Sequence, residues 1–158
     1  MAITIYNDFE SFSSITDKLS TVNFNNLPLE NTNSYYYHHV RPLIIPNPLV
    51  LEGIKLTSPC FLFSSYDENL DSDVIYVGEN SKIDFSQNTF GIMLKVENKE
   101  KCILKVTDYN DEVLLFECED LKPYISVGFS SPNGISSIQF LNSNTFLCSM
   151  LFAQAINQ

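Results

Sequence analysis

The feature that most constrains the fold is a run of alternating apolar and polar residues between Phe90 and Phe152. At its centre, residues 102–108 (CILKVTD) and 112–118 (EVLLFEC) flank a short Tyr-Asn-Asp segment. Alternation with a period of two places the apolar side chains on one face of a β-strand. Because Asn and Asp favour tight turns, the stretch predicts a β-hairpin with further strands before and after it.

Similar alternation recurs on both sides of this hairpin, and the composition agrees with it. The chain has 12 Phe and 8 Tyr but no Trp, and aromatic residues suit pleated, half-buried surfaces. Roughly ten short strands separated by turn residues are typical of two antiparallel sheets packed face to face. We therefore predict an all-β fold, a two-sheet antiparallel jelly-roll sandwich, as one domain over residues 1–158. Besides the hairpin, the expected strands are 21–25, 49–58, 60–63, 74–77, 82–85, 90–96, 124–129, 135–140 and 146–153.

A short N-terminal helix is predicted by a different period. Between about residues 7 and 19, four apolar residues recur at three- and four-residue spacing, which places them on one helix face: Phe9, Phe12, Ile15 and Leu19. Asn7 or Asp8 is a suitable N-cap. We expect this helix to cover one end of a sheet.

A long loop, about residues 28–48, follows the first expected strand. It contains Pro42, Pro46 and Pro48, which exclude a regular helix or a central strand because proline lacks the backbone N–H. Loops of this length in a compact domain are functional more often than short ones. We therefore expect this segment to shape any binding site.

The same loop holds the leading candidate for a ligand site. Tyrosines offer flat apolar faces for sugar rings, while His and Arg add hydrogen-bond donors and a titratable group. The predicted ligand-binding residues are Tyr35, Tyr36, Tyr37, His38, His39 and Arg41. The alternative is that the tyrosines cover a sheet face and the histidines face solvent. A neutral His38 or His39 could also act as a general acid or base, although the sequence assigns it no partner.

An acidic loop provides a candidate calcium site. Four oxygen-bearing side chains stand at alternate positions: Asp67, Asn69, Asp71 and Asp73. This spacing resembles the start of an EF-hand loop. However, Ser72 stands where that loop needs glycine, and Gly78 stands where it needs a bidentate glutamate. A solvated acidic loop is therefore the alternative to a metal site.

Motifs for covalent or nucleotide chemistry are absent from the sequence. No serine lies in a Gly-x-Ser-x-Gly elbow, and no cysteine is adjacent to a histidine. The 5 glycines are scattered, so no glycine-rich phosphate loop is present. The sequence therefore leaves catalysis unassigned.

The formal charge of -10, from 9 basic and 19 acidic residues, limits the partners. Such a charge repels phosphate backbones, so nucleic acid is excluded as an expected partner. Surface carboxylates also keep an aromatic-rich β-protein in solution. No segment is long enough to span a bilayer, so we expect no membrane insertion. The first residues show neither a basic start nor an apolar run, so we expect a cytoplasmic protein, or a secreted one if a leader was removed.

The four cysteines are too far apart for the usual zinc-site spacing: Cys60, Cys102, Cys118 and Cys148. Cys102 and Cys118 lie about equally far from the hairpin turn, so they could face each other. In a secreted protein this predicts a disulfide, whereas in the cytosol thiols stay reduced and act as small core residues. The pairing of these two cysteines is left open.

Several short segments occur in a familiar order: YNDFESF (6–12), VNFNNLP (22–28), GIKLTS (53–58), FGIML (90–94), the turn at 108–112, GFSS (128–131) and ISSI (135–138). Together they resemble bacterial PEP-CTERM exosortase-substrate ectodomains, over most of the chain. Those domains look like jelly-roll sandwiches related to carbohydrate-binding modules. The resemblance implies the same fold.

The chain departs from that family in two ways. The family carries a secretion signal and a C-terminal sorting anchor, which this sequence does not show, so we expect an intracellular relative. Related modules also often hold a structural calcium through acidic residues after the first-strand Phe and near the last strand. Here those places correspond to Asn25 and to Cys148 and Ser149, without a carboxylate.

The sequence supports three functional hypotheses, in this order. The first is a non-catalytic binding module for a carbohydrate or another small ligand, using the aromatic loop. The second is a small jelly-roll enzyme, of the cyclase or isomerase type, acting on an apolar metabolite. The third is a protein–protein interaction domain, including a homodimer, that pairs through an exposed sheet edge or an aromatic patch. Calcium is the one cofactor that the sequence suggests.

Overall fold

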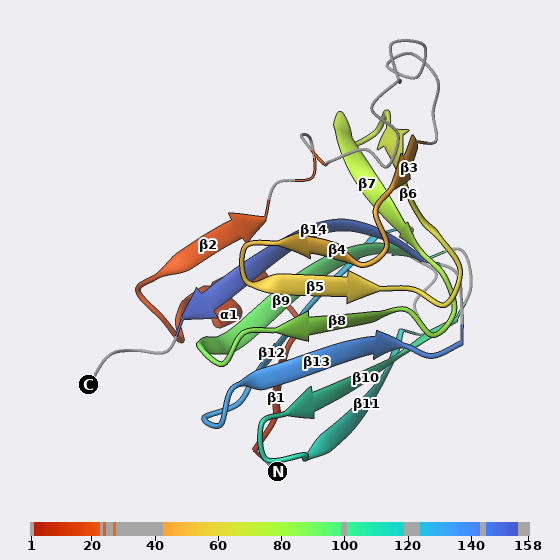
Figure 1. Cartoon of the computed structure of the whole chain (residues 1–158). Helices are drawn as coiled ribbons and strands as arrows, with labels where there is room; N and C mark the ends of the chain where they lie inside the picture. The colour runs from red at the N-terminus through yellow and green to blue at the C-terminus, as the bar shows by residue number, and fades with distance from the viewer. Residues whose placement is uncertain are drawn as a thin grey trace.

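Two packed β-sheets and one short helix make up the part of the chain that the computed structural model describes (Figure 1). This part comprises residues 2–22, 24, 27, 43–98, 101–118, 124–142 and 145–154. The predicted all-β sandwich with an N-terminal helix is confirmed. The elements are β1 (Thr4–Tyr6), α1 (Phe9–Ser13), β2 (Leu19–Val22), β3 (Leu43–Ile45), β4 (Leu49–Leu51), β5 (Ile54–Thr57), β6 (Leu62–Asp67), β7 (Ser72–Val77), β8 (Lys82–Phe85), β9 (Thr89–Asn98), β10 (Cys102–Asp108), β11 (Val113–Cys118), β12 (Tyr124–Ser130), β13 (Ile135–Phe140) and β14 (Thr145–Gln154).

The two sheets differ in size. Within the described residues, the large sheet has 8 strands in the order β1-β12-β9-β14-β7-β6-β3, with β2 paired to β14, and the small sheet has 6 in the order β11-β10-β13-β8-β5-β4. The small sheet lies in front of the large one in Figure 1. From β7 onward the chain alternates between the sheets, apart from the β10–β11 hairpin. This repeated crossing gives the jelly-roll pattern.

The core lies between the sheets and follows from the alternation in the sequence. In β10, Cys102, Leu104 and Val106 are buried, while the residues between them are only half-buried. Strand β5 of the same sheet alternates in the same way. The buried apolar residues of both sheets form one continuous hydrophobic cluster. Its largest fully buried side chains include Phe129, Phe140, Ile45, Leu49, Leu56, Leu62, Ile75, Ile83, Ile92, Leu94 and Leu104.

The helix is shorter than the predicted 7–19. It ends at Ser13, and Leu19 begins strand β2 instead, where it pairs with Ala153 of β14. The expected cap is correct, because Asp8 Oδ1 accepts a hydrogen bond of 2.7 Å from the Ser11 backbone N–H. Phe12 is fully buried against the large sheet. In the described residues, no helix is long and apolar enough to cross a membrane.

Two expectations for the first half also need correction. The stretch 49–58 is not one strand but a tight hairpin, β4 and β5, because Gly53 adopts a positive φ of 83° that reverses the chain. The predicted loop 28–48 contains strand β3, which pairs with β6 at the end of the large sheet. An edge position is compatible with the nearby prolines, because only one side of the strand carries ladder hydrogen bonds.

Asp108 ties the two turns at one end of the sandwich together. Its Oδ1 accepts hydrogen bonds from the backbone N–H groups of Asn110 and Glu112, both at 2.9 Å. Its Oδ2 accepts from Ser131 Oγ at 3.0 Å and from Asn133 Nδ2 at 3.3 Å. Burial raises the pKa of this carboxyl. The hydrogen bonds, of which the one from the Glu112 backbone N–H has the largest effect, outweigh burial and hold the pKa below its ordinary value of 3.8.

Candidate functional site

The aromatic segment that the sequence favours, Tyr35, Tyr36, Tyr37, His38, His39 and Arg41, lies outside the described residues. Its role in ligand binding therefore stays a prediction. The described residues nevertheless form a cleft at one end of the sandwich, with a volume of about 550 Å³. This volume lies within the range of about 300–1,000 Å³ that is typical of small-molecule sites.

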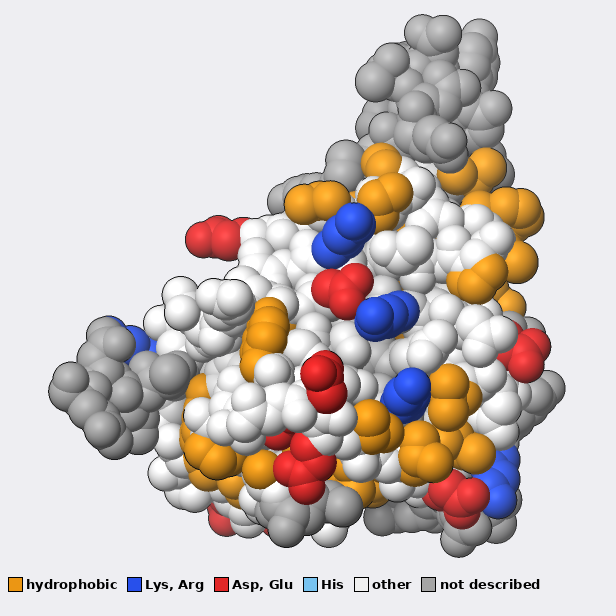
Figure 2. Space-filling view, turned by 60° about the horizontal axis from the view of Figure 1, so that its bottom comes forward, with side chains coloured by type: hydrophobic (Ala, Val, Ile, Leu, Met, Phe, Trp, Pro, Cys, Tyr) orange, Lys and Arg blue, Asp and Glu red, His pale blue; other side chains and the backbone are white. Residues whose placement is uncertain are grey.

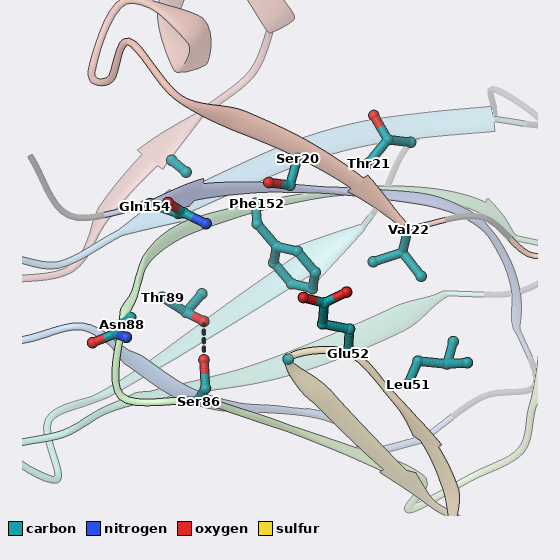
Figure 3. Close-up of a pocket in the computed structure, with 12 residues that line it drawn as sticks. Ser20, Thr21, Val22, Leu51, Glu52, Ser86, Asn88, Thr89, Phe152 and Gln154 are labelled. Carbon is teal, nitrogen blue, oxygen red and sulfur yellow. Dashed lines mark hydrogen bonds between the residues drawn. The ribbon is translucent and has the colours of Figure 1, made fainter.

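Four segments far apart in the sequence line this cleft, which we call the Phe152 cleft (Figure 3). Strand β2 and the end of β14 form one wall, and the β4–β5 turn and the β8–β9 connection form the other. The lining residues are Ser20, Thr21, Val22, Leu51, Glu52, Gly53, Ser86, Asn88, Thr89, Phe152, Ala153 and Gln154.

Strand pairing explains how the cleft forms. The first residues of β14 pair with β7, from Thr145 to Leu147, whereas its later residues pair with β2, from Met150 to Ala153. The small sheet contributes the β4–β5 hairpin opposite this second half of β14. The cleft therefore opens beside the half of β14 that pairs with β2 and not with β7.

The Phe152 ring is the apolar centre of the cleft. Figure 3 shows the ring projecting from β14 into the cavity, with the Glu52 carboxylate beside it. The ring is half-buried and makes an edge-to-face contact with Phe85, with centroids 6.0 Å apart. A Cβ atom at Gly53 would lie 4.0 Å from the ring, so the hairpin turn packs closely along its edge. These contacts hold the ring in place, and its exposed part faces the cleft.

Polar side chains surround this ring. Ser86 Oγ and Thr89 Oγ1 hydrogen bond to each other at 3.4 Å. The exposed side chains of Ser20, Glu52 and Asn88 make no hydrogen bond to another described residue. Their donors and acceptors are therefore available to a bound molecule.

The acidic loop has a structural role within the β6–β7 hairpin. Asp67 Oδ1 accepts hydrogen bonds from the backbone N–H groups of Asn69 (2.9 Å) and Leu70 (3.3 Å), and Oδ2 accepts one from the Tyr124 hydroxyl (2.8 Å). Burial raises the pKa of Asp67. The hydrogen bonds to its carboxylate, of which the bond from Tyr124 has the largest effect, outweigh burial and hold the pKa below its ordinary value of 3.8. Asp71 accepts a hydrogen bond from the Tyr66 hydroxyl. Among the described residues, no group of three or more His, Cys, Asp or Glu side chains could hold a metal ion, and calcium binding at Asp67, Asn69, Asp71 and Asp73 stays a prediction.

A smaller polar groove of about 400 Å³ lies on the outer face of the small sheet. Strands β8, β10 and β13 contribute charged and hydroxyl side chains to it, including the ion pair between Lys82 Nζ and Asp84 Oδ1 at 3.4 Å. Figure 2 shows lysine and acidic side chains mixed across one face of the molecule, with hydrophobic side chains around them. In contrast to the Phe152 cleft, the described residues that line this groove include no aromatic ring.

Comparisons with known proteins yield a likeness of fold but no family. No protein-family model matches the chain, and no curated protein matches it. Among solved structures, the chain is similar to a family 6 carbohydrate-binding module whose binding sub-sites were dissected by crystallography and calorimetry. The TM-score is 0.44 at 12% identity, covering 63% of this chain and 86% of that one. The resemblance to PEP-CTERM ectodomains stays a prediction, and the functional argument rests on the cleft.

The sequence alone did not indicate the Phe152 cleft. Its residues come from positions 20–22, 51–53, 86–89 and 152–154, and none of these short segments carries a recognisable motif. The one local signal is Glu52-Gly53, a turn pair between two apolar runs. Its meaning depends on the pairing of β2 with β14, which is a long-range contact.

Proposed function

We propose that this protein is a non-catalytic binding module and that the Phe152 cleft binds a neutral carbohydrate. The observation that carries the proposal is the exposed side of the Phe152 ring within a ring of polar groups. A sugar presents C–H groups on one face and hydroxyls at its edge. An aromatic ring surrounded by hydroxyl, amide and carboxylate side chains matches both surfaces.

The charge of the cleft supports a neutral ligand. Of the described residues that line the cleft, Glu52 is the only one with an ionisable side chain, and the whole chain carries a formal charge of -10. An anionic sugar would meet unfavourable charge both at the cleft and in the field around the protein. Sugars with free hydroxyls and no acid group avoid this cost.

The same lining supports binding without catalysis. Glycoside hydrolysis commonly uses two carboxylic acids on either side of the scissile bond, whereas the described lining of this cleft presents one. Among the described residues that line it, none is a cysteine or a histidine. The residues present can hold a ligand by stacking and hydrogen bonding, which is what a binding module requires.

The test is titration calorimetry of the protein with a panel of neutral oligosaccharides, comparing Phe152→Ala with Phe146→Ala. Phe146 is also a half-buried aromatic residue of β14, but it lies outside the cleft and packs on Tyr76. Stacking of a nucleobase on an aromatic side chain contributes about 1–3 kcal/mol. If a sugar face stacks on Phe152 to a similar extent, Phe152→Ala should weaken binding about 5- to 150-fold. Phe146→Ala should leave the affinity unchanged.

The same titration separates the cleft from the aromatic loop. If Phe152→Ala binds as the wild type does while Tyr36→Ala combined with His38→Ala abolishes binding, the cleft assignment is wrong and the loop is the site. If no neutral oligosaccharide binds, the carbohydrate proposal itself fails. Circular dichroism of each variant shows whether the sandwich has folded.

A further inference from the structure

Cys102 and Cys118 lie directly opposite each other on adjacent strands of the small sheet. They are register partners at the end of the β10–β11 hairpin. Both side chains point into the core, with 0% and 3% of their surface exposed, and both thiols are reduced. We propose that this cross-strand dithiol is an oxidation site that closes to an intramolecular disulfide.

The backbone places the two α-carbons at a suitable distance. The Ile103 carbonyl accepts a hydrogen bond from Leu141 N–H at 2.9 Å, on the β13 side of β10. The neighbouring residue, Cys102, therefore directs its peptide groups to the opposite side, toward Cys118. In such a hydrogen-bonded antiparallel pair the α-carbons lie about 5.5 Å apart. Disulfides span α-carbon distances of about 4.4–6.8 Å, so the bridge needs no change of register.

The distance between the two β-carbons predicts a strained disulfide that is easily reduced. Directly opposite β-carbons in an antiparallel pair lie about 4.5–5.5 Å apart, and the longer value belongs to hydrogen-bonded pairs. A disulfide requires about 3.5–4.5 Å, so closing the bond pulls the two strands together locally. Strained disulfides have more oxidising potentials than relaxed ones. The pair should therefore open again in the presence of a dithiol reductant.

The other two cysteines do not share this geometry. Cys148 lies on β14 in the large sheet, and burial raises the pKa of its thiol to about 12. Cys60 is exposed and lies outside the strands. Cys102 accepts a hydrogen bond from Thr145 Oγ1 at 3.5 Å, which orients its sulfur within the core. Only Cys102 and Cys118 are placed as cross-strand partners.

The oxidation proceeds by exchange with a small-molecule disulfide such as oxidised glutathione. Cys118 is the last residue of β11, which is the end strand of the small sheet in the described chain. Its thiolate attacks one sulfur of the reagent, forming a mixed disulfide and releasing one glutathione thiolate. The Cys102 thiolate then attacks the Cys118 sulfur and displaces the second glutathione. The two protons of the protein thiols end on the two released glutathione molecules.

The experiment treats the folded full chain with oxidised glutathione, blocks remaining thiols with iodoacetamide and digests it with trypsin. Lys105 lies between the two cysteines, so cleavage after it separates them unless a disulfide joins the fragments. We expect a linked pair of peptides that lacks two hydrogen atoms and separates on treatment with dithiothreitol. The Cys60→Ser/Cys148→Ser variant should give the same linked pair, and adding Cys118→Ser should remove it.

Two outcomes would overturn the proposal. One is the absence of the linked pair after the oxidant, with Cys102 and Cys118 both alkylated once the protein is denatured and glutathione found on Cys60 alone. The other is a stable glutathione adduct on Cys118 that never resolves to a linked pair. Because Cys148 is buried and its replacement can impair folding, the wild-type chain is digested in parallel and its linked peptides are assigned directly.

Discussion

Replacing Gly128 with alanine should destabilise the protein by forcing Phe12 out of its place on the large sheet. Gly128 lies in β12, and Phe12 of helix α1 packs on it. A Cβ atom at this position would lie 2.8 Å from Phe12 Cδ2, 3.3 Å from its Cγ and 3.4 Å from Tyr6 Cβ. Ordinary contacts of a Cβ atom begin at about 3.4 Å, so the ring must retreat by about 0.6 Å, the difference from 2.8 Å.

The ring has little room for that movement. Phe12 is fully buried, and the Tyr6 ring packs edge-to-face against it with centroids 5.8 Å apart. Gly91 on the neighbouring strand is also close, because a Cβ atom there would lie 3.1 Å from Phe12 Cε2. Overpacking of a well-packed core costs about 1–3 kcal/mol. For a domain of this size, that corresponds to a fall in melting temperature of roughly 2–12 °C.

Thermal unfolding monitored by circular dichroism measures this effect, with Ser126→Ala as the matched control. Ser126 lies on the same strand with its side chain exposed, so its replacement should change stability by less than about 0.5 kcal/mol. A double-mutant cycle with Phe12→Ala identifies the cause, since removing the ring should abolish most of the cost of Gly128→Ala. If Gly128→Ala is equally destabilising without the ring, the steric reasoning is wrong.

Two further predictions concern the turns of the small sheet. Asp108→Asn should lower the free energy of unfolding by roughly 1–3 kcal/mol, because the amide cannot accept all four hydrogen bonds of the buried carboxylate. Since the folded-state pKa of Asp108 is lowered, its stabilisation is present above pH 3.8 and is lost as the pH falls through the lower, folded-state value. Melting curves from pH 7 to pH 2 should thus be less steeply acid-dependent for the variant, and equal slopes would contradict the assignment. Gly53→Ala should cost about 1–2 kcal/mol because of the positive φ of 83°, and an unchanged melting temperature would show that the turn relaxes.

The sandwich could be predicted because its signal is local. Each of β5, β8 and β10 alternates buried and less buried residues along its own sequence. The helix boundary could not be read in the same way, because Leu19 continues the helical spacing of apolar residues but pairs with Ala153 in the sheet. Strand β1 was missed because it is only 3 residues long and forms by pairing with β12. Local periodicity fails where a distant strand supplies the hydrogen bonds.

The candidate site was less predictable than the fold for the same physical reason. The aromatic loop attracted attention because its chemistry is concentrated in one segment, which lies outside the described residues. The Phe152 cleft combines side chains from four separate segments. In the sequence, Phe152 is one of the apolar residues in the last predicted strand, and Glu52 belongs to a stretch predicted as a continuous strand. Only the hairpin at Gly53 and the pairing of β2 with β14 bring the two together.

The irregularity in β14 links the fold to the cleft. The register of β14 with β9 shifts between Leu147 and Ser149, so Cys148 lies at a bulge, where extra twist bends the strand. The exchange of β7 for β2 as the neighbour of β14 occurs across this same bulge, between Leu147 and Met150. Beyond this bulge, β14 pairs with β2, and this half of the strand carries Phe152 into the cleft. The residue at the bulge, Cys148, is buried, and burial raises the pKa of its thiol to about 12, so it stays protonated at neutral pH as a small apolar side chain.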